Sequence, residues 1–197
     1  PFLSINAFNL WTLVPENSWV SDSISIFNIS GRTLGFILFT FLSLFTINNW
    51  KKEGFSPKYA AKVAAIILIC FYAFTTRMHE RHLLFGLPFL TLAVATESWL
   101  LIPLSLLTLT FSLNLYGAYF WVNHAQTWPF SPSVISLISW ITTLTSLVLA
   151  SIWSWPQSLK SGVLLLKSHK LLVGLLIVAS LLRLVNLSYP STYIFDD

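Results

Sequence analysis

The sequence predicts an all-α fold, a polytopic bundle of about six transmembrane helices. The first observation is composition: 55% of the 197 residues are hydrophobic and only 9% are charged, too few to cover a soluble protein. The second is that the apolar residues form runs near the ~20 residues that a helix needs to cross a bilayer. The third is that every lysine lies between these runs or at their edges, in two groups.

The runs predict spans of unequal strength. One of them, 83–96, is short and contains Gly86 and Pro88, so we expect it to be bent or to cross incompletely. The others reach the ~17 residues that a thinned bilayer tolerates. The predicted spans are 33–50, 60–76, 83–96, 99–121, 134–155 and 171–188.

Charge predicts the orientation of these spans. With six alternating spans, the loops after the first and fifth spans share one side, and the positive-inside rule makes that side cytoplasmic. Residues 1–32, 77–82, 121–132 and 191–197 then lie outside, and the loop at Glu97 lies inside. If the third span did not cross, the lysines would be divided between the two faces. The lysines are Lys51, Lys52, Lys58, Lys62, Lys160, Lys167 and Lys170.

Composition also excludes several kinds of site and partner. The single cysteine, Cys70, excludes a disulfide framework and a thiol metal site. The pI near 9.4 is compatible with nucleic-acid binding, but the basic residues form no stripe on a soluble surface. We therefore expect no nucleic-acid partner and a lipid bilayer instead. Because the chain begins at Pro1 and stops soon after its last apolar run, we expect a fragment cut at both ends.

A cluster of ionisable side chains lies at the predicted outer end of the second span. It comprises Arg77, His79, Glu80, Arg81 and His82. Arginine matches phosphate oxygens as a bidentate fork, and histidine adds a donor whose charge changes near neutral pH. The cluster therefore suits an anionic group at the membrane surface, such as a lipid-linked phosphate. The alternative is that it only anchors the helix at the headgroups; its position opposite the lysines argues against this.

The two histidines of the cluster do not predict a metal site. His79 and His82 are three residues apart, one too few for the H-E-x-x-H pattern of zinc peptidases. We therefore predict no metal ligands. No cofactor is assigned, and a divalent metal stays open.

Other candidate residues lie in the predicted outer segments. Interface anchoring accounts for most tryptophans and tyrosines, but Trp11, Trp19 and Trp128 are candidate rings for stacking on a sugar. Asp196 is a carboxylate beside aromatic residues that could act as a general base toward a sugar or protein hydroxyl. The alternative for Asp196 is an ordinary solvated loop.

The stretch "TRMHERHLLFGLPFL" resembles a known motif. It looks like the extracytoplasmic His-Glu-basic motif of GT-C membrane glycosyltransferases, which take sugars from polyprenyl phosphates. It is most similar to the bacterial mannosyltransferase-like members and to the N-glycan glucosyltransferases, whose motif has Lys after the Glu. The stretch "NAFNLWTL" also looks like a segment of these proteins. The resemblance covers roughly 1–155 and implies the C-terminal part of a GT-C module.

The end of the chain carries a second resemblance. The stretch "YPSTYIFDD" looks like the start of a protein O-mannosyltransferase or aminoarabinose-transferase type module. Asp196 falls on the Asp that is implicated in catalysis there, whereas Asp197 departs from the commoner Glu. This resemblance implies a tandem protein, with 156–170 as a basic cytoplasmic linker and 171–197 as the first span and outer loop of a second module.

Together the resemblances imply an integral-membrane glycosyltransferase. It would transfer a hexose such as mannose from a polyprenyl-phosphate carrier to a hydroxyl of a glycan, lipid or protein, on the extracytoplasmic side of a bacterial plasma membrane. Arg77, His79, Glu80, Arg81 and His82 would bind the donor phosphate and stabilise its leaving charge. Asp196 would deprotonate the acceptor of the second module. The fragment alone is expected to be inactive.

The alternative function is a non-catalytic transporter or flippase that binds an anionic lipid or solute at its outer face. Transporters commonly place ionisable residues in the middle of the membrane. The predicted spans 33–50, 60–76, 99–121 and 134–155 have no ionisable residue in their middles, which counts against an ion pathway.

Overall fold

The structure is a computed structural model that describes residues 2–14, 20–26, 28–124 and 127–151. Most of these residues are helical, which confirms the all-α prediction in its coarse form. The helices are η1 (Leu10–Thr12), α1 (Gly31–Lys52), η2 (Pro57–Tyr59), α2 (Ala60–Phe74), η3 (Glu80–Phe85), α3 (Leu87–Val94), η4 (Ser98–Leu100), α4 (Leu101–Asn123) and α5 (Pro132–Ser151). A two-stranded antiparallel hairpin, β1 (Ser25–Ile26) and β2 (Ile29–Ser30), precedes α1.

Four of the described helical segments are long and apolar enough to cross a membrane. They match four of the predicted spans to within a few residues. The sixth predicted span (171–188), the predicted linker (156–170) and Asp196 lie outside the described residues. The four segments are Gly31–Lys52, Pro57–Phe74, Ser98–Asn123 and Pro132–Ser151.

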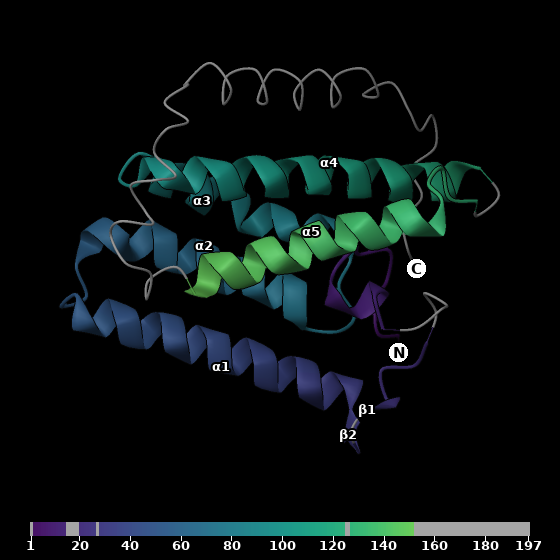
Figure 1. The fold of residues 1–197 in the computed structure, drawn as a ribbon, viewed down its shortest axis with the longest axis horizontal. Coiled ribbons are helices and arrows are strands. Elements are labelled where there is room, and N and C mark those ends of the chain that lie inside the picture. Colours follow the sequence, from purple (N-terminus) through teal and green to yellow (C-terminus); the bar gives the residue numbers. More distant parts are fainter. Residues whose placement is uncertain (1, 15–19, 27, 125–126, 152–197) are drawn as a thin grey trace.

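The four long helices lie side by side as a bundle (Figure 1). Helix α2 is central: α1, α3 and α5 all pack against it, and α4 packs against α5 and α3. Helices α2 and α4 run in the same direction, because Lys62 near the start of α2 contacts Glu97 just before α4, while Tyr72 near the end of α2 contacts Asn114 in the second half of α4. The chain must therefore cross the length of the bundle between residues 75 and 97.

The crossing is made by two short helices in place of one continuous span. Pro88 at the first turn of α3 has no backbone N–H to continue a helix from the preceding turn, and η3 and α3 meet at Gly86. A Cβ on Gly86 would lie 2.6 Å from the side chain of Ile69, so only glycine allows this approach to α2. The sequence predicted a bent or incompletely crossing third segment, and the structure divides this segment into two short helices.

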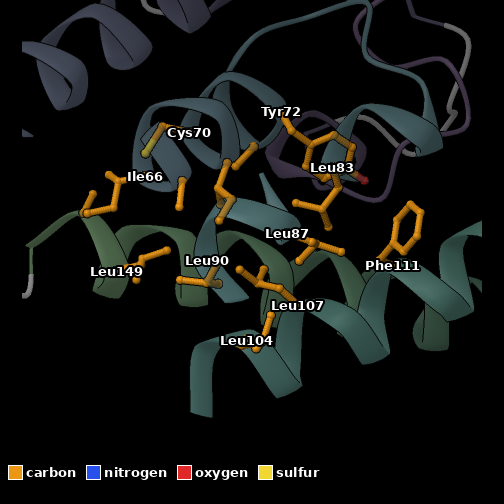
Figure 2. Close-up of a cluster of buried hydrophobic side chains, with 14 of the residues drawn as sticks. Ile66, Cys70, Tyr72, Leu83, Leu87, Leu90, Leu104, Leu107, Phe111 and Leu149 are labelled. Atoms are coloured by element: carbon orange, nitrogen blue, oxygen red, sulfur yellow. The ribbon is translucent and has the colours of Figure 1, made fainter. Parts of the chain in front are cut away.

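The bundle is apolar both in its interior and on its outer surface, as a fold that faces lipid requires. Inside, α2, η3, α3, α4 and α5 share one apolar core that includes Ile66, Leu83, Leu90, Leu107 and Leu149 (Figure 2). Outside, large apolar side chains of α1 stay exposed. These are Phe36 at 64%, Phe41 at 65% and Leu44 at 61% exposed. A soluble monomer would rarely expose such a contiguous apolar face, so the surface agrees with a membrane protein.

The end of the bundle that holds Lys51, Lys52, Lys58 and Lys62, called here the lysine end, has one unexpected feature. Lys62 is only 4% exposed and forms an ion pair with Glu97, which also accepts a hydrogen bond from Nε1 of Trp99. The Nζ atom of Lys62 lies 4.6 Å from the ring centroid of Tyr59. Lys62 therefore lies within α2 as a buried link to the start of α4 and is not a loop cation.

Candidate functional site

The end of the bundle opposite the lysines is closed by the N-terminal segment, residues 2–14. The last four carbonyl groups of a helix have no partner within the helix. For α2, Asn9 Nδ2 donates to the carbonyl oxygen of Tyr72 at 2.9 Å, and Trp11 Nε1 donates to that of Phe74 at 2.6 Å. Both side chains are almost completely buried. The "NAFNLWTL" stretch is therefore a cap on the end of α2.

Two glycines of α1 make room for this cap. A Cβ on Gly35 would lie 2.5 Å from the carbonyl oxygen of Phe74 and 2.9 Å from the ring of Trp11. A Cβ on Gly31 would lie 2.6 Å from the side chain of Leu3. Trp11 consequently packs directly against the backbone of α1. At 1% exposure its ring cannot stack on a sugar, so that interpretation of Trp11 is wrong; Trp19 lies outside the described residues.

Asn114 of α4 ties the same segment to the bundle. Its Oδ1 accepts hydrogen bonds from the backbone N–H of Phe8 at 3.0 Å and from the hydroxyl of Tyr72 at 2.9 Å. Its Nδ2 donates to the carbonyl oxygen of Asn6 at 2.7 Å. A buried amide with its donor and acceptor both engaged fixes a unique arrangement, because every alternative would leave polar atoms unsatisfied.

The backbone of the predicted cluster pairs with the N-terminal segment. The N–H of Arg77 donates to the carbonyl oxygen of Leu3, and the N–H of Ile5 donates to that of Met78, each at 3.0 Å. Between these bonds Arg77 adopts a left-handed backbone conformation, with φ of 62°, which is uncommon for residues other than glycine. The pairing holds Arg77 at the turn where the chain leaves α2 and heads for η3.

An ion pair joins Arg77 to Asp22, a residue that the sequence analysis did not single out. Arg77 Nε lies 2.7 Å from Asp22 Oδ2; the Asp22 side chain is 4% exposed, whereas the Arg77 side chain is 43% exposed. The backbone oxygen of Asp22 also accepts the N–H of Arg32 in the first turn of α1. The one sequence feature that could have pointed to Asp22 is that it and Glu16 are the two acidic residues of the predicted outer segment 1–32.

The histidines of the cluster occupy the start of η3. The backbone N–H of His79 donates to Nδ1 of His82 at 2.9 Å, so this nitrogen is unprotonated and accepts. Burial, together with the neighbouring His79 and Arg81, lowers the pKa of His82 below its usual value of 6.5. His82 is thus held as a neutral ring that stabilises the turn, and it adds little positive charge at neutral pH.

The remaining cluster residues differ in exposure. Arg81 is exposed, while His79 and Glu80 are half-buried, with His79 Nδ1 4.0 Å from Glu80 Oε2. The structure therefore brings the five predicted residues together at one end of α2. The two arginines are the exposed cations among them, and both lie at the opposite end of α2 from Lys58 and Lys62.

An aromatic group adjoins the N-terminal segment at the same end. Trp128 packs against Phe8 and Trp121, with ring centroids 5.3 and 6.1 Å away. Gly117 lies beneath it, since a Cβ there would be 3.2 Å from the rings of Trp128 and Phe130. Trp128 is half-buried, and its interpretation as a sugar-stacking ring stays a prediction.

Within the part of the chain that the structure describes, no three His, Cys, Asp or Glu side chains gather closely enough to hold a metal ion. Over the residues that the structure describes, the fold and the site define an α-helical protein with four helices of membrane-spanning length, in which Arg77 and Arg81 of the cluster are exposed opposite the lysine end. The chain matches no family model, no curated protein and no solved structure. The likeness to GT-C enzymes therefore depends on the motif residues themselves.

Proposed function

We propose that this chain is part of an integral-membrane glycosyltransferase that transfers a hexose from a polyprenyl-phosphate carrier to an acceptor hydroxyl on the extracytoplasmic face of a bacterial plasma membrane. The observation that carries the proposal is the position of Arg77 and Arg81, which are exposed at the opposite end of α2 from Lys58 and Lys62. By the positive-inside rule the lysine end is cytoplasmic, so the arginines face the outer headgroups.

The chemistry of the donor explains why cations are needed there. When the sugar leaves a polyprenyl phosphate, negative charge accumulates on the phosphate oxygens. Fixed cations close to those oxygens stabilise the transition state more than the ground state. Arg77 and Arg81 supply two guanidinium groups, and His79 adds a nearby donor at the start of η3.

The similarity of the "HER" stretch, His79–Arg81, to the GT-C motif supports this assignment of roles. In the proposal Glu80 orients the basic side chains, as its approach to His79 at 4.0 Å allows. Asp196, which lies outside the described residues, is the proposed general base of a second module. The acceptor class, whether glycan, lipid or protein, is a separate question for the assay.

The test is sugar transfer by the full-length protein reconstituted with a polyprenyl-phosphate-hexose donor. Arg81→Ala removes an exposed cation without breaking an ion pair and should lower turnover by about 10²-fold. Arg32→Ala is the matched control, because Arg32 is an exposed arginine of the same end that lies outside the cluster. Normal turnover by the Arg81 variant would remove the assigned role. Movement of the lipid across the bilayer without sugar transfer would favour the flippase.

A further inference from the structure

Asp22 and Arg77 form an ion pair between segments 55 residues apart, and Asp22 contacts only one edge of the Arg77 guanidinium group. A guanidinium group has two edges with two donors each: a side edge with Nε and one Nη, and an end edge with both Nη atoms. Asp22 contacts Arg77 through Nε at 2.7 Å, so it uses the side edge. Either edge can donate to two oxygens, and with Asp22 on the side edge the end edge is the one left to meet a phosphate; the Arg77 side chain remains 43% exposed.

We propose that Asp22 is a positioning residue, which holds the Arg77 side chain so that its end edge meets the phosphate of a polyprenyl-phosphate carrier. This inference rests on the proposed function and adds the residue that orients the phosphate-binding arginine. A long, flexible side chain would otherwise lose rotamer freedom at each binding event. A partner that fixes it beforehand removes that cost.

Asp22 can do this because it is itself fixed from several sides. Its side chain is 4% exposed, and its backbone oxygen accepts the N–H of Arg32 at 3.0 Å. The neighbouring carbonyl of Val20 accepts the N–H of Leu3 at 2.8 Å, and Leu3 in turn accepts the N–H of Arg77. A chain of backbone hydrogen bonds therefore connects the segment of Asp22 to the backbone of the arginine that its carboxylate holds.

Charge repulsion and side-chain positioning predict opposite changes in phosphate affinity when the negative charge of Asp22 is removed. The carboxylate is negative, so by charge alone it repels a phosphate on the far side of Arg77. If charge were its only effect, Asp22→Asn would tighten phosphate binding. If Asp22 positions Arg77, the same variant weakens binding, because a neutral amide oxygen holds the guanidinium less strongly than a carboxylate does.

The experiment measures binding of polyprenyl phosphate to the full-length protein in phosphatidylcholine nanodiscs. Asp22→Asn should raise the Kd about tenfold, because the hydrogen bond that positions Arg77 loses its charge assistance, and Asp22→Glu should restore most of the affinity. In an Arg77→Ala background Asp22→Asn should have no further effect, since Asp22 acts through Arg77. Thermal unfolding confirms that each variant is folded, and Asp22→Ser replaces the asparagine variant if that one unfolds. Glu53→Gln, an exposed acid in the loop after α1, is the control.

Unchanged or tighter binding by Asp22→Asn would overturn the inference, as would an equal loss with and without Arg77. Failure of the proposed function has a different signature. A wild-type protein that binds polyprenyl phosphate, shows the coupling between Asp22 and Arg77, and transfers no sugar would support the positioning role and contradict the glycosyltransferase. Sugar transfer by a protein in which the Asp22 and Arg77 variants have additive effects on the Kd would support the glycosyltransferase and contradict the positioning role. A wild-type protein that does not bind polyprenyl phosphate contradicts both.

Discussion

The indole of Trp11 donates a hydrogen bond to the backbone carbonyl of Phe74, 2.6 Å away and 63 residues later in the sequence. Phe74 is the last residue of α2, and three residues later Arg77 begins the cationic cluster. The N-terminal segment therefore determines where α2 ends and where the cluster starts. Residues that look remote from the candidate site in the sequence form its base.

Replacing Trp11 by phenylalanine tests this relationship. Trp11→Phe keeps an aromatic ring but removes the N–H, which leaves the Phe74 carbonyl without this donor at a buried helix end. We expect the free energy of unfolding to fall by about 1–3 kcal/mol. The measurement is chemical unfolding in detergent micelles. The control is Trp140→Phe, because Trp140 lies on α5 and its side chain is 50% exposed. Equal losses of unfolding free energy in the two variants would contradict the role of the hydrogen bond.

Gly35 is the position where a single methyl group should be most harmful. The Cβ of Gly35→Ala would lie 2.5 Å from the Phe74 oxygen, a backbone atom that cannot move aside cheaply. We expect a loss of about 1–3 kcal/mol in the free energy of unfolding, as for other overpacked interiors. Ile37→Ala, two residues along α1 at an exposed position, provides the comparison. A Gly35 variant as stable as wild type would mean that α1 does not approach α2 this closely.

The spans could be predicted from the sequence, whereas the cap could not. Run length decides whether a helix crosses a bilayer, and length alone located α1, α2, α4 and α5. The break at Gly86 was expected because glycine and proline disfavour a continuous helix. The hydrogen bonds that tie Asn9 and Asn114 to the bundle join residues 42 or more positions apart, and no local pattern encodes them.

The candidate site was predicted only in part for the same reason. The cluster is contiguous, so Arg77, His79 and Arg81 could be found from the sequence. Asp22 reaches Arg77 across 55 residues, and its only mark in the sequence, as one of two acidic residues in segment 1–32, does not identify that partner. Trp11 was misread because an indole in an outer segment suits both a sugar platform and a buried donor; only its packing decides between them.

The proposed orientation of the bundle, with the lysine end cytoplasmic, predicts opposite accessibilities for its two ends. In a Cys70→Ala background, Arg81→Cys and Lys58→Cys each place one thiol at an exposed position. A membrane-impermeant maleimide applied to intact cells should label the first variant within minutes and the second only after permeabilisation. Labelling of both from outside, or of Lys58→Cys alone, would contradict the orientation.

The pH dependence of stability should report on His82. Burial and the nearby His79 and Arg81 lower its folded-state pKa, with Glu80 opposing them, so below about pH 6.5 the unfolded chain binds the proton more readily. The contribution of His82 to stability is therefore complete above pH 6.5 and is lost as the pH falls through the folded-state pKa. His82→Gln should flatten this part of the stability profile between pH 7 and 5. His124→Gln, an exposed loop histidine, should leave it intact, and identical profiles for wild type and the His82 variant would refute the assignment.

At the lysine end, the Lys62–Glu97 pair should be worth more to the fold than a surface ion pair. Lys62 is 4% exposed and Glu97 16%, so removing one partner leaves a charge with little access to water. Glu97→Gln should lower the free energy of unfolding by about 3–5 kcal/mol, the range for breaking buried pairs. Because desolvation offsets most of the attraction, the double variant Lys62→Met with Glu97→Leu should recover most of that loss. Glu53→Gln, an exposed acid of the same end, should change stability by less than about 0.5 kcal/mol. If the double variant is no more stable than Glu97→Gln, the buried charge of Lys62 is not the source of the loss.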